Sequence, residues 1–278
     1  MGVPEVQNAA FQELTPAWRR VAWRALVGAA VAAWLATAWT PVAAKGLPQA
    51  AVAKQVDAIF AEYGHADSPG CALAAIKDGA IVYENGYGMA DIEHHVPIRP
   101  ETVFYIGSVS KQFTAMAAAL AIQEGKIGLD DDIRRFVPEL PDYGRPITVR
   151  HLVHHTSGLR DIYSVLSAAG RRDQDAFDNY ALLRIVAKHK ELNFMPGDEH
   201  LYSNSGYAVL ALVVERATGT PFAEYAETKI FRPLGMTVSH FHDDISRLVE
   251  HRAYAYQRGA GGQLRLNNAD SERVGAGG

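Results

Sequence analysis

Ser108-Val109-Ser110-Lys111 opens a helical pattern in which Phe113, Met116, Ala117, Leu120 and Ala121 form one apolar face, and Gly125 ends it. A serine hydroxyl is a weak nucleophile until a neighbouring group takes its proton. A lysine three residues further on lies one helical turn away, on the same face as the serine. The stretch therefore predicts an amine held beside Ser108 at the start of a helix.

Tyr202-Ser203-Asn204 follows Ser108 after 94 residues and precedes a second helical pattern at 205–218. A tyrosine and an asparagine arriving from elsewhere would complete a site that moves protons and holds a substrate. We therefore take Ser108, Lys111 and Tyr202 as candidate catalytic residues and Asn204 as a candidate substrate-binding residue. The alternative is an ordinary capped helix with a solvated lysine and a packing tyrosine. The paired motifs favour the chemical interpretation.

The remaining patterns predict a mixed α and β chain. Apolar residues at helical spacing indicate a first helix over 49–63, and two strands then flank Asp78-Gly79, a strong signal for a two-residue hairpin turn. The other expected elements are a short helix capped by Thr148, an amphipathic helix within 175–190, and a second hairpin formed by 253–257 and 263–267.

Residues 1–44 differ from the rest of the chain. Arg19, Arg20 and Arg24 precede an uncharged apolar run from Ala25 to Ala44 that ends in Val42-Ala43-Ala44. This pattern predicts a cleaved export signal, hence a periplasmic protein of bacterial type, with 45–278 as the mature domain. The alternative is an uncleaved inner-membrane anchor, because the run is about long enough to span a bilayer. In that case the chain would contact the membrane only through this segment.

Composition excludes several functions. The formal net charge of -4, without any Lys/Arg run, argues against nucleic acid as a partner. Cys71 is the single cysteine, so neither an internal disulfide nor a cysteine-based metal site can form. Asp130-Asp131-Asp132 lacks the spacing of a calcium loop, and His151, His154 and His155 lack a matching carboxylate. We therefore expect neither a metal nor another cofactor.

From about residue 50 to 278 the chain resembles the serine β-lactamase and penicillin-binding protein superfamily. Its closest resemblance is to the branch of class C β-lactamases, related esterases and D-amino-acid peptidases. The resemblance lies in residues 106–114, in His154-His155-Thr156-Ser157-Gly158-Leu159, in Pro196-Gly197 through Tyr207, and in Pro233-Leu234-Gly235-Met236. It implies an α/β (α+β) fold, in which an antiparallel sheet with flanking helices meets an all-helical region at the site.

The resemblance also implies a mechanism. Ser108 would attack a reactive carbonyl of a small molecule or peptide, and water would then cleave the acyl-enzyme. Lys111 and Tyr202 would act jointly as the base, since the identity of the group that removes the serine proton is disputed in this superfamily. The backbone N–H of Ser108 would be one oxyanion donor. The implied substrate is a β-lactam, an ester or a D-peptide.

One element of the superfamily pattern is missing. The third motif, Lys/His followed by Thr/Ser/x and Gly on a late strand, has no counterpart here. In similar proteins the sequence resembling 274–278 lies well before the end, so we expect a chain whose C-terminal part and sheet are incomplete. That expectation keeps open a non-catalytic alternative, namely a penicillin-binding sensor or an inactive truncated homologue.

Overall fold

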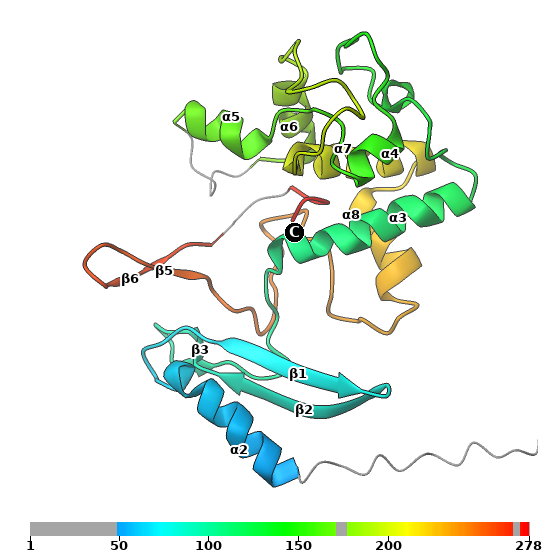
Figure 1. Cartoon of the computed structure of the whole chain (residues 1–278). Coiled ribbons are helices and arrows are strands. Elements are labelled where there is room, and N and C mark those ends of the chain that lie inside the picture. The colour runs from blue at the N-terminus through cyan, green and yellow to red at the C-terminus, as the bar shows by residue number, and fades with distance from the viewer. Residues whose placement is uncertain (1–48, 171–176, 269–272, 278) are drawn as a thin grey trace, which may run out of the picture. The chain divides into compact units, whose positions relative to one another are not determined.

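The computed structural model describes residues 49–170, 177–268 and 273–277 (Figure 1). Its helices are α2 (Gln49–Ile59), α3 (Lys111–Gln123), α4 (Val149–Val153), α5 (Ile162–Ala168), α6 (Asn179–Val186), α7 (Asn204–Thr218) and α8 (Phe222–Ala226). Short 3-10 helices cover Ala61–Tyr63, Gly107–Ser110 and Ile133–Arg135, and a π-helical turn covers Glu227–Phe231. The strands are β1 (Cys71–Lys77), β2 (Ala80–Tyr87), β3 (Met89–Asp91), β4 (Val96–Pro97), β5 (Tyr256–Arg258) and β6 (Leu264–Leu266).

The first hairpin follows the sequence prediction. β1 and β2 pair antiparallel, with Lys77 opposite Ala80. Asp78 and Gly79 both have positive φ, as a type I′ turn requires. Within the described residues, each sheet has two strands: β1 with β2, β3 with β4, and β5 with β6. The last pair is the predicted second hairpin, shorter than expected.

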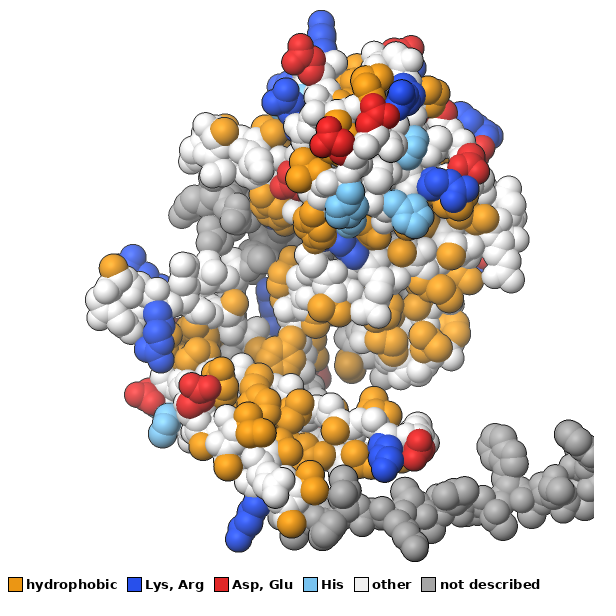
Figure 2. Space-filling view, in the orientation of Figure 1, with side chains coloured by type: hydrophobic (Ala, Val, Ile, Leu, Met, Phe, Trp, Pro, Cys, Tyr) orange, Lys and Arg blue, Asp and Glu red, His pale blue; other side chains and the backbone are white. Residues whose placement is uncertain are grey.

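Apolar side chains remain in contact with solvent on the first hairpin. Figure 2 shows hydrophobic side chains gathered over β1 and β2. Ile76 and Ile81, which face each other across the strands, are 71% and 59% exposed. The α2 helix is tied to β2 at Asp57, whose carboxylate accepts hydrogen bonds from the hydroxyls of Tyr83 (2.7 Å) and Tyr87 (2.8 Å). These bonds lower the pKa of Asp57.

The hydrophobic core lies in the helical region around α7. The side chains from Ser205 to Val214 are all buried, so α7 is covered on every face. It packs against α3, α4, α5, α6 and α8. Ser203 caps its first turn by accepting a hydrogen bond from Gly206 N–H at 3.1 Å, and Gly219 ends it in the left-handed conformation. This central helix carries Asn204 at its first position.

The start of α3 differs from the expectation. The sequence pattern placed the beginning of the helix at Ser108, whereas Gly107–Ser110 form a 3-10 helix and α3 begins at Lys111. A 3-10 turn has three residues per turn, so side chains at i and i+3 are aligned one above the other. The tighter turn therefore brings Lys111 over Ser108 more directly than an α-helical turn would.

None of the helices in the described ranges is long and apolar enough to cross a bilayer. The export signal or anchor predicted for residues 1–44 lies outside the described residues.

Candidate active site

The packing of α3 against α7 brings the two sequence motifs together. Lys111, the first residue of α3, donates a hydrogen bond from Nζ to Oδ1 of Asn204, the first residue of α7, at 2.9 Å. Lys111 Nζ also donates to Ser108 Oγ at 3.1 Å. The Tyr202 hydroxyl donates to the same Oγ at 2.7 Å. All four residues proposed from the sequence therefore lie within one hydrogen-bonded cluster.

The Lys111 side chain is buried, and its donors are fully engaged. Besides Ser108 and Asn204, its Nζ donates to the carbonyl oxygen of Ala276 at 2.5 Å. The residue is 7% exposed, and its Nζ lies 4.8 Å from the centre of the Tyr202 ring. Three oxygen acceptors around one nitrogen match the three hydrogens of an ammonium group. The three hydrogen bonds therefore hold Lys111 Nζ in a fixed position beside Ser108.

Asp161 holds Asn204 in place and was not identified from the sequence. Its Oδ1 accepts from Tyr163 N–H at 3.1 Å and so caps α5. Its Oδ2 accepts from both the backbone N–H of Asn204 (2.6 Å) and the side-chain amide Nδ2 (3.1 Å). With Nδ2 directed to this carboxylate, Asn204 Oδ1 faces Lys111. An aspartate directly before the apolar start of a helix is a cap signal that could have drawn attention to it.

His155 contacts Tyr202 and was also missed as a site residue. Its ring centroid lies 4.6 Å from that of Tyr202. The sequence placed His155 in a histidine cluster and in one of the stretches that carry the family resemblance. It gave His155 no role in the site, because its proximity to a residue 47 positions later depends on the fold. Among the described residues, no group of three or more His, Cys, Asp or Glu side chains is placed to hold a metal ion.

The segment 274–277 lies against the site. Thr114 donates to the carbonyl oxygen of Gly275 at 2.9 Å. Asn179 is bonded twice to Val274, since its Nδ2 donates to the carbonyl (3.0 Å) and its Oδ1 accepts from the N–H (3.2 Å). Gly275 has a φ of +94°, and a Cβ there would lie 2.7 Å from the Ala211 side chain. A glycine is therefore required for this segment to approach α7 and present Ala276 to Lys111.

An open groove of about 680 Å³ borders the cluster, with Tyr202, Asn204, Asp161 and Arg160 among its lining residues. Tyr202 is 45% exposed, so the hydroxyl side of the cluster is accessible from solvent. The volume of this groove lies within the range of about 300–1,000 Å³ that is typical of small-molecule sites.

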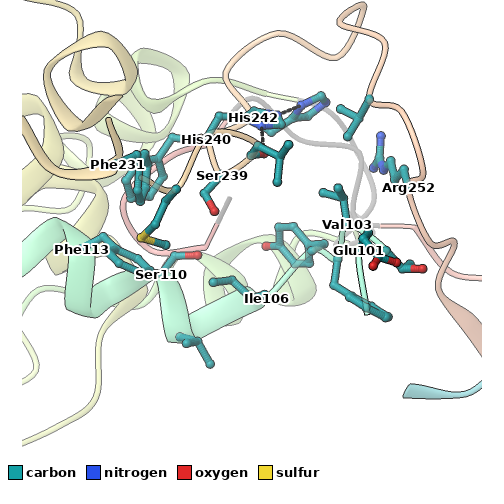
Figure 3. A pocket seen from close by; sticks show the side chains of 18 of the residues that line it. Glu101, Val103, Ile106, Ser110, Phe113, Phe231, Ser239, His240, His242 and Arg252 are labelled. Carbon is teal, nitrogen blue, oxygen red and sulfur yellow. Dashed lines mark hydrogen bonds between the residues drawn. The ribbon is translucent and has the colours of Figure 1, made fainter. Parts of the chain in front are cut away.

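A second cavity of about 400 Å³ lies on another side of the 3-10 turn, with Ser110, Phe113, His240 and His242 among its lining residues (Figure 3). The His240 and His242 rings lie within hydrogen-bond distance of each other, at 3.3 Å. Of the four clustered residues, Tyr202 and Asn204 line the first groove and not this cavity, and Ser108 and Lys111 are among the lining residues of neither. Its walls are largely apolar, and it offers no nucleophile paired with a base. The candidate site therefore borders the first groove.

Comparisons with known proteins agree with the geometry. The Beta-lactamase family profile matches residues 56–278. Penicillin-binding protein 4* of Bacillus subtilis is 30% identical over 207 residues, which cover 73% of this chain and 45% of the relative. D-aminopeptidase of Gluconobacter oxydans is 33% identical over 168 residues, or 60% of this chain and 31% of the relative. Esterase EstB of Burkholderia gladioli is 32% identical over 236 residues, or 80% and 59%.

A solved structure, the octameric penicillin-binding protein homologue from Pyrococcus abyssi, superposes with a TM-score of 0.71 at 30% identity, covering 82% of this chain and 52% of that one. The chain thus spans between about a third and three fifths of the length of these curated relatives. The mixed fold of helices and small antiparallel sheets is confirmed by this likeness. The family match covers four fifths of the sequence, and the hydrogen-bonded cluster joins the Ser-x-x-Lys and Tyr-x-Asn motifs. This chain therefore belongs to the beta-lactamase family of serine hydrolases and penicillin-binding proteins.

Proposed function

We propose that this chain is an exported serine hydrolase that forms an acyl-enzyme on Ser108. The observation that carries the proposal is the pair of hydrogen bonds at Ser108 Oγ, from Lys111 Nζ at 3.1 Å and from the Tyr202 hydroxyl at 2.7 Å. Nucleophilic catalysis needs a nucleophile in contact with a group that can take its proton. That second group must itself be held in place by further groups.

Lys111 and Tyr202 act jointly as the base in this proposal, since both contact Ser108 Oγ. The pair takes part with one proton fewer than a phenol and an ammonium hold together, so it can accept the serine proton. That proton passes to the pair as Ser108 Oγ bonds to the carbonyl carbon of the substrate. The tetrahedral intermediate collapses, the leaving group departs with a proton returned through Tyr202, and an ester on Ser108 remains. Water activated at Tyr202 attacks this ester, and the Ser108 hydroxyl is restored with release of the acid.

Asn204 holds a substrate amide or Lys111 in this proposal. Its Oδ1 faces Lys111, and the residue lines the open groove beside Tyr202. The backbone N–H of Ser108 lies in the first turn of a helix, where amides lack intrahelical acceptors, and supplies one oxyanion donor. No cofactor enters any step.

The substrate is a small molecule or peptide with a reactive carbonyl: a β-lactam, an ester or a D-amino-acid peptide. The relatives support this range, because they include proteins named as a penicillin-binding protein, a D-aminopeptidase and an esterase. The first of these names also favours a second candidate, a non-catalytic penicillin-binding sensor that acylates without turnover.

Export to the periplasm rests on the sequence of residues 1–44, with its basic start, apolar run and small residues at 42–44. A membrane anchor formed by the same run is the alternative. Neither interpretation involves nucleic acid as a partner.

Two experiments test the function of the chain. The first follows over time the labelling of the protein by a fluorescent penicillin and by a fluorophosphonate. The second measures hydrolysis of a panel of β-lactam, ester and D-peptide substrates. We expect both probes to label wild type and Ser108→Ala to abolish labelling and hydrolysis while leaving the fold intact, because Ser108 is the N-cap of neither the 3-10 turn nor α3. Rapid loss of label indicates turnover, and a lasting adduct indicates the sensor. Full activity of Ser108→Ala on every substrate would refute the nucleophile assignment.

A further inference from the structure

His155 binds the backbone on both sides of Tyr202. Its carbonyl oxygen accepts a hydrogen bond from Leu201 N–H at 3.0 Å. Its ring nitrogen Nδ1 accepts from Ser203 N–H at 3.1 Å. Because Leu201 and Ser203 are the immediate neighbours of Tyr202, a single residue fixes the chain directly before and directly after the phenol.

The imidazole ring also packs on the Tyr202 ring itself. The two rings are tilted by 35° with centroids 4.6 Å apart. On α7, Tyr207 contributes a second ring at 5.0 Å and 33°, and its hydroxyl donates to the Val153 carbonyl at 3.1 Å. His155 therefore contacts both Tyr207, which is fixed in the core, and Tyr202, which is exposed at the site. Through these contacts the fixed Tyr207 restrains the position of the Tyr202 ring.

We infer that His155 is a positioning residue that holds the Tyr202 hydroxyl against Ser108 Oγ. The inference rests on the proposed acyl transfer for its kinetic consequence. The 2.7 Å contact between Tyr202 and Ser108 is made by a side chain that is almost half exposed. An exposed ring on a loop would otherwise sample several rotamers, each of which takes its hydroxyl away from Ser108.

The backbone conformation of His155 does not by itself call for a histidine. Its φ of +57° lies in the left-handed region, which glycine and asparagine adopt more readily. What histidine adds is a flat ring that stacks and a nitrogen that accepts a hydrogen bond. Both additions are directed at Tyr202 and its neighbour.

The hydrogen bond requires a neutral imidazole whose proton is on Nε2, because a protonated ring has no acceptor. Burial lowers the pKa of His155, and the charge of Lys111 lowers it further. The titratable groups that face it are Lys111 from α3, His154 after α4, His200 from the loop before α7, and the phenols of Tyr202 and Tyr207. Acidification through this pKa therefore breaks the bond to Ser203.

Two substitutions separate the ring from the acceptor. His155→Phe keeps a flat ring without an acceptor, and His155→Asn keeps an acceptor and tolerates the positive φ without a ring. His154→Phe and His154→Asn are the matched controls, since His154 is the exposed neighbour in sequence. We expect His155→Phe to lower kcat for hydrolysis by roughly 10–100-fold with little change in KM, His155→Asn to restore part of it, and both controls to behave like wild type.

Equal losses in the His154 and His155 variants, or a wild-type kcat in His155→Phe, would overturn the inference. A fall in thermal stability without the split between kcat and KM would also overturn it, because that pattern indicates a purely structural role.

A measurement that needs no activity keeps this inference distinct from the proposed function. In the ¹⁵N NMR spectrum of the wild-type chain, we expect His155 Nδ1 to be unprotonated at neutral pH. The Ser203 amide shift should follow the titration of His155 and lose its pH dependence in His155→Phe. A protonated Nδ1, or a Ser203 amide indifferent to that titration, contradicts the positioning role whether or not the chain hydrolyses anything. Failure of Ser108→Ala to abolish labelling contradicts only the proposed function.

Discussion

Replacing Asp161 with alanine tests how the site is assembled. The carboxylate caps α5 through Tyr163 N–H and holds Asn204 through two hydrogen bonds, at 2.6 Å and 3.1 Å. Asp178→Ala is the matched control. Asp178 is also a half-buried N-cap, and its Oδ1 accepts from Ala181 N–H at 2.6 Å. Asp178 has no hydrogen bond to Asn204 among those described. The difference in unfolding free energy between the two variants therefore isolates the contribution of the Asp161–Asn204 hydrogen bonds.

The magnitude follows from these bonds. Loss of a cap costs about 1 kcal/mol of unfolding free energy in either variant. Hydrogen bonds to an ionised acceptor contribute about 1.5–3 kcal/mol, and removal of Asp161 also leaves the Asn204 N–H without that acceptor. We therefore expect Asp161→Ala to be less stable than Asp178→Ala by about 1.5–3 kcal/mol. For a chain of this size the difference in Tm is roughly 3–12 °C.

Urea unfolding of both variants, followed by circular dichroism, measures the difference, provided that the slope with denaturant is the same in each. Hydrolysis by Asp161→Ala should also fall, because an untethered Asn204 amide can turn its Oδ1 away from Lys111. The reasoning is refuted if Asp161→Ala is no less stable than Asp178→Ala, or if it keeps wild-type kcat.

Three further predictions concern the relay, the histidines and the N-terminal segment. Lys111→Ala and Tyr202→Phe should each lose most activity, and the double variant should be little worse than either. The reason is that the effects of removing groups that share one relay are strongly non-additive. Additive losses in kcat would argue against a shared step. Burial lowers the pKa of His151, His155, His240 and His242 below 6.5, so the unfolded chain binds more protons than the folded chain. The Tm should therefore fall as the pH drops through about 6.5, and a constant Tm from about pH 7.5 to about pH 5.5 would contradict this. Finally, the four tryptophans are Trp18, Trp23, Trp34 and Trp39, so protein cleaved after Ala44 should show tyrosine fluorescence alone. Tryptophan emission from the exported protein would favour the membrane anchor.

Much of the local structure could be predicted from the sequence, because its causes are local. Asp78-Gly79 specifies a turn whose residues both need positive φ, and β1 and β2 end where the pattern places them. Gly219 ends α7 in the left-handed conformation that glycine accepts at least cost. The alignment of Lys111 with Ser108 is also local, although the pattern missed that a 3-10 turn produces it.

The sequence also identified Ser108, Lys111, Tyr202 and Asn204 as candidates, but only through the spacing of two motifs. Their meeting depends on the packing of α3 against α7, which joins residues 93 positions apart at one hydrogen bond. The substrate class stays a proposal, since it depends on the shape of the groove and on the whole length of the protein.

The sequence by itself determined the hairpin and the helix capped by Thr148, since each is set by residues within a few positions of one another. It also indicated Ser108, Lys111, Tyr202 and Asn204 as candidate reacting groups through two short motifs. Only the tertiary structure decided what holds those groups. Asp161 on Asn204, His155 on Tyr202 and Ala276 on Lys111 are contacts between segments distant in the chain. Local periodicity and spacing do not indicate such contacts, because they form only when the other helices pack around the buried α7 in one core.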